Sequence, residues 1–343
     1  MSQPVAVVAG RWRSTGRYRG PVSTSAPAEP TGTSPEHDRT TDDRPDRLAR
    51  FRGWTRAVLV ANVVAQIAII VTGGAVRLTA SGLGCSTWPM CEPGQFTPVF
   101  HDAATFHPYV EFGNRLMTGV LSVIAVAVLL LVLTDRRRSE TYRALGIVPL
   151  AGVALQAVIG GIVVLLELHP GWVSLHFVLS AALVWVSAYL LHRHGEGDGA
   201  PVPVGTRSVR RAGSVLGLLT VPIVVLGVIV TGSGPHSGDA DVGYRLAVDP
   251  LAFTRAHAWT VWVFCGVLAA LVVLLHRLPA DGVVLRARRG AWLLVVVTLA
   301  QGAIGYTQYF TGLPALLVGF HMLGAGLLVW AAANAVLRLR TRA

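Results

Sequence analysis

Charged side chains are scarce in this sequence: they make up 14% of its 343 residues, and every basic residue is an arginine. A soluble domain carries about 25% charged residues, so this composition excludes an ordinary soluble domain. The absence of lysine excludes no class of protein, because we attribute it to genomic bias. Near Met1 there is no basic segment followed by an apolar one, so we expect no cleaved signal peptide.

Apolar residues dominate instead. They form 52% of the chain, the mean hydropathy is +0.56, and several apolar stretches approach the roughly 20 residues that cross a bilayer as a helix. We therefore predict an all-α integral membrane protein. The net charge of +11 could suggest a nucleic-acid partner, but most arginines lie in short clusters between apolar runs, so we expect no nucleic acid.

Eight membrane spans are predicted after an N-terminal tail. Residues 1–46 are rich in Pro, Ser, Thr, Gly and charge and lack apolar periodicity, so we predict a disordered tail. The spans are expected at 54–76, 108–133, 143–167, 172–191, 212–231, 253–275, 290–310 and 314–337. Because the number of spans is even, both termini should lie on one side of the membrane.

Arginines assign the sides. The loops 77–107, 168–171, 232–252 and 311–313, together with the span ends beside them, hold only four arginines. Nineteen arginines belong to the segments 47–56, 135–143, 192–211 and 276–289 and to the C-terminus. The positive-inside rule therefore places the arginine-rich segments and both termini in the cytoplasm.

The two halves of the sequence repeat each other. Gln156 and His176 are 20 residues apart, as are Gln301 and His321, and a tryptophan follows each histidine after nine residues. Upstream, "VTGGAVRLTASG" resembles "VTGSGPHSG" at corresponding span ends. The repeat predicts two tandem, pseudo-symmetric four-helix bundles related by an axis along the membrane normal. We assign them to 47–195 and 212–343, joined by a cytoplasmic linker at 196–211.

Ionisable groups inside a membrane span are costly and are typical of functional sites. His176, His257 and His321 lie inside predicted spans, each within about two turns (~10 Å) of the outer end. Two imidazoles from facing helices can clamp a haem iron between them. We therefore predict a haem held by His257 and His321. Histidines that are merely buried and hydrogen-bonded are the alternative.

The first unit should hold a porphyrin differently. His176 corresponds to His321, but the counterpart of His257 is Asn114, by position within the span. Asparagine is a poor ligand for haem iron because it is neutral and weakly basic. His176 is therefore expected to be the only strong ligand in this unit.

A carboxylate accompanies this weaker ligand set. Glu111 lies one turn before Asn114 on the same helix face, where the second unit has Thr254. The difference predicts reactive chemistry in the first unit and a fixed cofactor in the second. An ion pair between Glu111 and Arg115 is the alternative, and the two are compatible because Arg115 could hold the carboxylate ionised.

Three arginines, Arg77, Arg115 and Arg255, lie near the outer membrane boundary. Arginine pairs well with carboxylates, so these residues could hold haem propionates. Snorkelling of interfacial arginines explains their positions equally well.

Cysteines are few, but two of them, Cys85 and Cys91, lie close together in the first outer loop. On the oxidising side of a membrane such a pair predicts a disulfide, either structural or redox-active. Zinc is the alternative, but it would need His101 and His107 at a spacing unlike common zinc motifs. The third, Cys265, is expected to be a small buried apolar residue.

Several of these segments together resemble one known family. They are "GGAVRLTASGLGCSTWPMC", "EFGNR", "LQAVIGG", "GSGPHSGD", "RAHAW" and "GFHMLGAG", and the resemblance, to heme A synthases, covers about residues 54–337. It implies a bacterial plasma-membrane protein with eight spans in two four-helix units. It also implies an oxidoreductase that converts a methyl group of heme O to a formyl group, giving heme A for cytochrome oxidase.

The resemblance implies a substrate site in the first unit. Glu111 matches the family's essential glutamate and would be catalytic, and His176 would ligate the iron of the substrate haem. Asn114, Arg115 and Arg77 would complete the substrate-binding set. Many members have histidine where this chain has Asn114, so two-histidine ligation of the substrate is not expected here.

The resemblance implies a resident haem b in the second unit, with His257 and His321 as axial ligands. Cys85 and Cys91 match the family's cysteine pair. Heme O synthase and the cytochrome oxidase assembly pathway are the implied partners. The electron acceptor, for example a quinone, and the oligomeric state, for example a homo-oligomer, stay open.

Two other functions compete with this one. A b-type cytochrome that only transfers electrons would bind haem without changing a porphyrin. A small-molecule transporter would bind no haem, and tandem repeats with polar sites are common in transporters. Against a transporter, the polar groups lie near the outer span ends rather than the midplane.

Overall fold

The structure is a computed structural model of the chain, and it describes residues 48–99, 105–236 and 238–342. The predicted tail, residues 1–46, lies outside the described residues, as does His101. All described residues belong to one structural unit, in which helices dominate and a two-stranded sheet is the sole sheet assigned.

Helices of the first half lie close to four predicted spans. They are η1 (Ala49–Trp54, 3-10), α1 (Thr55–Leu78), α2 (His107–Leu133), α3 (Glu140–Leu145), α4 (Val148–Leu165) and α5 (Pro170–His194). Helices α3 and α4 together cover the predicted span 143–167, and they form one segment that is long and apolar enough to cross a membrane. A short break between Leu145 and Val148 divides this segment. Pro149 explains the break, because it has no N–H to donate to the carbonyl of Leu145.

Helices of the second half match the remaining predictions. They are α6 (Arg207–Ser233), α7 (Pro250–His276), α8 (Gly282–Phe310) and α9 (Ala315–Leu337). Helix α6 begins inside the predicted linker 196–211, where the hydroxyl of Thr206 accepts from the N–H of Val209 and caps the helix. An unpredicted antiparallel pair joins β1 (Val202–Pro203) to β2 (Arg340–Thr341).

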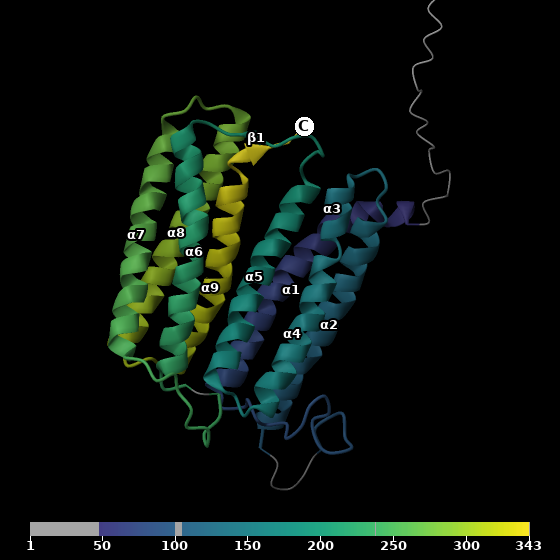
Figure 1. The fold of residues 1–343 in the computed structure, drawn as a ribbon, viewed down its shortest axis with the longest axis vertical. Helices are drawn as coiled ribbons and strands as arrows, with labels where there is room; N and C mark the ends of the chain where they lie inside the picture. Colours follow the sequence, from purple (N-terminus) through teal and green to yellow (C-terminus); the bar gives the residue numbers. More distant parts are fainter. Residues whose placement is uncertain (1–47, 100–104, 237, 343) are drawn as a thin grey trace, which may run out of the picture. The chain divides into compact units, whose positions relative to one another are not determined.

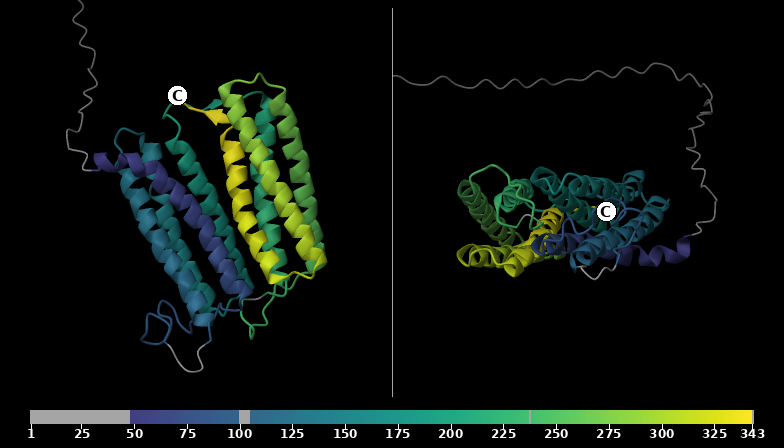
Figure 2. Two further views of the ribbon diagram at one scale, coloured as in Figure 1. Left: turned by 180° about the vertical axis from the view of Figure 1, so that it is seen from behind. Right: turned by 90° about the horizontal axis from the view of Figure 1, so that it is seen from below.

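The long helices contact one another in two rings. One ring runs α1, α2, α4, α5, and the other runs α6, α7, α8, α9; Figure 1 and Figure 2 show the second ring beside the first. Between the rings, α1 and α5 contact α9, and α5 contacts α6. Apolar packing fills both places: Phe264 and Leu271 lie in the core of the second ring, and Ile70, Val184 and Val329 lie where α1, α5 and α9 meet.

Seven helical segments of the described chain are long and apolar enough to cross a membrane. They are Ala49–Leu78, His107–Leu133, Glu140–Leu165, Pro170–His194, Arg207–Ser233, Pro250–His276 and Ala315–Leu337. Helix α8, which contains the predicted span 290–310, is not among them, although it has 29 residues. Three arginines near its start and two glutamines toward its end interrupt its apolar character.

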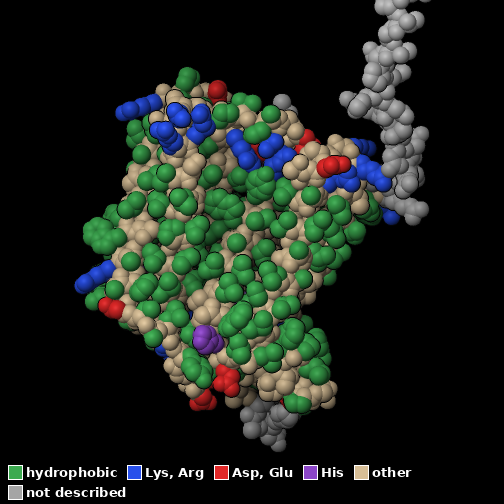
Figure 3. All heavy atoms as spheres, viewed as in Figure 1, with side chains coloured by type: hydrophobic (Ala, Val, Ile, Leu, Met, Phe, Trp, Pro, Cys, Tyr) green, Lys and Arg blue, Asp and Glu red, His purple; other side chains and the backbone are tan. Residues whose placement is uncertain are grey.

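The two ends of the helices differ in charge. Hydrophobic side chains cover the middle of the face in Figure 3, and arginines gather at the end where β1 lies. We call this the arginine end. The opposite end carries residues 79–99 and 238–249, and we call it the loop end. Large apolar side chains such as Leu218 (71% exposed) and Val123 (72%) face outward from the helices, which suits contact with lipid.

Candidate functional site

Each predicted intramembrane histidine lies against a glycine of the neighbouring helix. The distance from a Cβ added at the glycine to the imidazole Cε1 is 3.4 Å for Gly160 and His176, 3.2 Å for Gly227 and His257, and 3.2 Å for Gly305 and His321. Carbon atoms prefer separations of about 3.5–4.0 Å. Glycine therefore leaves room for the Cε1 edge of each imidazole to approach the neighbouring helix closely.

The imidazoles have polar atoms without protein partners. In the described part of the chain, the Nδ1 atoms of His176, His257 and His321 are buried and have no hydrogen-bond partner. The imidazoles of His257 on α7 and His321 on α9, each beside a glycine and each with an unpartnered nitrogen, fit ligation of a haem.

Two glutamines that recur in the internal repeat contact two of these histidines, His176 and His321. Gln156 Nε2 on α4 donates to the backbone carbonyl of His176 on α5 at 3.0 Å. Gln301 Nε2 on α8 donates to the carbonyl of His321 on α9 at 3.1 Å. The equal spacing of these pairs in sequence was the one signal of this contact, and it did not reveal which atoms meet.

Glu111 is buried near the loop end of α2, with 4% of its surface exposed. Its Oε1 accepts from Arg115 Nε at 3.1 Å and from a terminal nitrogen of the same guanidinium at 2.5 Å. Its Oε2 accepts from the backbone N–H of Cys85 at 2.7 Å. The predicted ion pair is therefore present, and it joins the carboxylate to the loop that contains the cysteines.

The predicted disulfide between Cys85 and Cys91 is confirmed, and both residues are fully buried. Arg115 holds the disulfide loop to α2, because its guanidinium also donates to the carbonyls of Thr87 at 3.0 Å and Met90 at 3.1 Å. Within the described residues no group of three or more His, Cys, Asp or Glu could hold a metal ion. The disulfide uses both thiols, so neither is free to bind zinc.

Asn114 takes part in a different contact from the histidines. Its Oδ1 accepts from the hydroxyl of Thr72 on α1 at 2.7 Å and lies 3.9 Å from the position of a Cβ at Gly73. The asparagine thus joins α1 to α2 at the level where the second ring has a histidine over a glycine. Its amide oxygen is already used by a neighbouring hydroxyl, which suits a supporting role.

Arg77 ends α1 beside a cavity of about 210 Å³ at the loop end. The cavity is also lined by His236, Asp239 and Arg245. A terminal nitrogen of Arg77 donates to the carbonyl of Thr231 at 2.9 Å, and its Nε is buried without a partner. Arg255, by contrast, is exposed on the first turns of α7.

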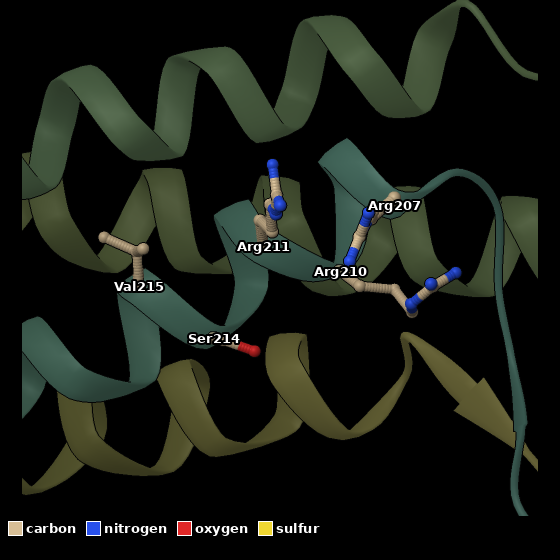
Figure 4. Close-up of a pocket in the computed structure, with 5 residues that line it drawn as sticks. All are labelled: Arg207, Arg210, Arg211, Ser214 and Val215. Atoms are coloured by element: carbon tan, nitrogen blue, oxygen red, sulfur yellow. The ribbon is translucent and has the colours of Figure 1, made fainter.

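A larger cavity, of about 400 Å³, lies at the arginine end. Figure 4 shows its lining on α6: Arg207, Arg210, Arg211, Ser214 and Val215. Arg207 precedes Gly227, the glycine under His257, by 20 residues, or about 30 Å of helix. This cavity is therefore separate from the histidines.

A polar cluster at the arginine end is structural. Asp198 accepts from Arg138 Nε at 2.8 Å and from the backbone N–H and hydroxyl of Ser139, each at 2.9 Å, and it also pairs with Arg193 at 3.2 Å. The hydrogen bond from Arg138 lowers the pKa of Asp198 well below its ordinary value. The cluster ties the segment after α5 to the start of α3.

Fold and site together define an all-α, multi-pass membrane protein whose buried polar groups gather near the loop end of its helices. The profile of the COX15-CtaA family, described as a cytochrome oxidase assembly protein, matches residues 56–236, more than half of the chain. The chain belongs to this family.

Individual relatives agree with this assignment. The chain is 32% identical to the heme A synthase of Geobacillus thermodenitrificans over 141 residues, which is 40% of the chain and 42% of the relative. It is 30% identical to that of Geobacillus kaustophilus over 145 residues (42% and 44%) and to that of Symbiobacterium thermophilum over 146 residues (42% and 46%). Each match spans less than half of the relative's length.

Proposed function

We propose that the protein is a heme A synthase, an oxidoreductase that converts a methyl group of heme O to a formyl group and so supplies heme A for cytochrome oxidase. The family match and the names of the relatives support this function. The observation that carries it is Glu111, a buried carboxylate held by Arg115 and by the N–H of Cys85 within the matched region.

Heme O would lie among α1, α2, α4 and α5, with its iron near His176 and with Asn114, Arg115 and Arg77 completing the site. Two successive oxidations of the methyl group would give a gem-diol, which would lose water to form the aldehyde. Each oxidation would replace a C–H bond with a C–OH bond whose oxygen comes from water, and would release two protons and, to the electron acceptor, two electrons. Oxidation builds positive charge on the carbon beside the ring, and an anion placed there lowers the barrier.

Glu111 is the residue that we assign to this role. A carboxylate has about four acceptor sites, and Glu111 accepts three hydrogen bonds from Arg115 and Cys85. Burial disfavours the ionised form of this carboxylate, and the arginine and the hydrogen bonds favour it. Glu111 can therefore stabilise the developing charge or accept a proton.

A haem b would be held in the second ring by the imidazoles of His257 and His321. Held by two imidazoles, such a group would supply electron transfer. The glycines Gly227 and Gly305 give the two rings their space. Electrons would leave to an acceptor of the quinone class.

For the architecture, we propose eight spans, namely the seven segments above and α8. They would form two tandem four-helix units at 47–195 and 212–343. Helix α7 ends on the cytoplasmic side and α9 begins on the outer side in this topology. Helix α8, which connects them, must therefore cross the membrane. The arginine end would face the bacterial cytoplasm with both termini. Heme O synthase would supply the substrate, and a homo-oligomer stays a prediction.

A reduced-minus-oxidised spectrum of the purified protein tests the haem. We expect a b-type signal that His257→Ala and His321→Ala each abolish. A protein without this signal would exclude both the synthase and a b-type cytochrome and would leave the transporter. A variant that kept the signal would exclude our ligand pair.

Extraction of haems from cells that make heme O but lack heme A synthase activity tests the reaction. Wild type should produce heme A, whereas a b-type cytochrome would not. Glu111→Gln should lower production by about 10²- to 10⁴-fold and keep the b-type spectrum. The matched control is Glu167→Gln, an exposed carboxylate at the same end, which should behave as wild type. Full activity of Glu111→Gln would exclude our catalytic residue.

A further inference from the structure

We propose that Gln156 and Gln301 are positioning residues, each of which fixes the height and rotation of the helix that carries a haem-ligating histidine. The inference rests on the ligand roles proposed above for His176 and His321. Neither glutamine reaches an imidazole; each acts through the backbone of the histidine.

Gln301 binds an atom whose position determines where His321 lies. Within α9 the carbonyl of His321 has one lone pair directed along the helix, toward the N–H four residues on, and a second lone pair to spare. Gln301 Nε2 donates to this carbonyl from α8 at 3.1 Å. The bond therefore joins two helices at the ligand itself.

Two glycines add steric contacts on either side of that bond. A Cβ at Gly324, on α9, would overlap Oε1 of Gln301, so the amide of Gln301 lies in a notch in α9. Gly305, one turn after Gln301 on α8, faces the imidazole of His321. The backbone bond and the ring contact together fix His321 at two points, four residues apart along α8.

The same arrangement occurs in the first ring. Gln156 Nε2 donates to the carbonyl of His176 at 3.0 Å and to the hydroxyl of Ser180 at 2.6 Å. Ser180 in turn donates to the carbonyl of His176 at 3.0 Å. Gly160, one turn after Gln156, faces the imidazole. Among the described residues, no side chain donates to the carbonyl of His257. The hydrogen bond from a glutamine to a histidine carbonyl therefore occurs at His176 on α5 and His321 on α9 only, within the described chain.

The amide oxygen of each glutamine indicates which of its two polar atoms matters. Oε1 of Gln156 and Oε1 of Gln301 are buried without a hydrogen-bond donor among the described residues. A buried acceptor without a donor is costly, and an apolar side chain of similar size would avoid that cost. The donor to the histidine carbonyl is therefore the contribution that the amide makes at both positions.

The test compares haem b content and spectrum in the full-length protein. Gln301→Met removes the donor and keeps the size, and we expect about 10- to 100-fold weaker haem b retention, as for other residues that orient a metal ligand. Gln301→Glu should restore retention, because a buried carboxyl stays protonated and can donate the same bond. Thr298→Val is the matched control: Thr298 is buried one turn earlier on α8 and bonds only within that helix.

The equivalent change in the first ring separates a local from a global effect. Gln156→Met should keep the wild-type b-type spectrum and bind added heme O about 10- to 100-fold more weakly. If Gln301→Met does not fold, Gln301→Asn, whose amide is one methylene shorter, replaces it with the same expected loss.

Three results would overturn the proposal. Wild-type haem b retention and spectrum in Gln301→Met would show that the bond does not matter. Equal losses in Gln301→Met and Gln301→Glu would show that restoring a donor does not restore haem b, so donation to the carbonyl of His321 is not what the amide contributes. Equal loss of haem b in Gln156→Met would show a global effect. A wild-type protein without haem b would instead contradict the ligand assignment on which this inference rests. The wild-type spectrum alone would show that result, whereas the three results above come from the variants.

Discussion

Gly305→Ala perturbs one proposed haem ligand with a single methyl group. The added Cβ would lie 3.2 Å from Cε1 and 3.7 Å from Nδ1 of His321. Carbon atoms prefer about 3.5–4.0 Å, so the imidazole must move by a few tenths of an ångström. Its backbone is held by Gln301, so the ring has to tilt rather than follow the helix.

Two opposite effects are expected from this change. Alanine favours a helix over glycine by about 1 kcal/mol, so the protein without haem should become slightly more stable. Overpacking against a held side chain costs about 1–3 kcal/mol, which corresponds to roughly 5- to 150-fold weaker haem b binding at about 1.4 kcal/mol per tenfold. Greater stability with weaker haem binding is not the signature of general damage.

Thermal unfolding of haem-free protein and titration with haem measure the two effects separately. The matched control is Gly302→Ala, three residues earlier on α8, where an added Cβ meets nothing within 4 Å. Both variants should gain helix stability, and only Gly305→Ala should lose haem b affinity. Equal affinity and equal spectra in the two variants would refute the assignment of His321 as a ligand resting on Gly305.

The remaining predictions concern the disulfide loop and the arginine end. The double variant Cys85→Ser, Cys91→Ser should destabilise the loop by about 2 kcal/mol. It should also lower heme A production, measured in extracted haems, because the backbone N–H of Cys85 donates to Glu111. Unchanged production would show that the loop does not position the carboxylate. Asp198→Asn should lower the free energy of unfolding by about 1 kcal/mol at neutral pH. Since the folded-state pKa of Asp198 is lowered, its stabilisation is present above its unfolded pKa and is lost as pH falls through the folded value. The difference from wild type in unfolding experiments should therefore shrink in acid, and a difference that grew in acid would contradict the sign of the shift.

Membrane spans were predictable because an apolar run long enough to cross a bilayer has one stable solution, a helix. Seven such segments are present in the described chain, and α8 shows the limit of the rule, because its polar residues obscure a helix that packs between its neighbours. The break at Pro149 was also readable in principle, since a proline inside a helix removes a hydrogen bond. The span predicted at 143–167 is present, but the prediction did not mark the break within it.

The residue types of the candidate site came from the sequence, but most of their contacts did not. Depth within a span and the internal repeat singled out Glu111, His176, His257 and His321, and the short spacing of the two cysteines predicted their disulfide. Neither the bond from Cys85 to Glu111 nor the contacts of Gln156 and Gln301 followed from spacing alone. A residue's position along a helix gives its face, but not which atom of another helix it will meet.

The sequence by itself determined the all-helical membrane class, the two arginine-poor and arginine-rich sides and the repeat, because each depends on side-chain composition at a regular spacing. Tertiary structure alone decided which groups meet. Glu111 is bonded by a loop residue 26 positions earlier, and each glutamine binds a histidine carbonyl 20 positions later. Such bonds depend on the height and rotation of packed helices, and helix packing is a property of the whole ring of helices rather than of any segment.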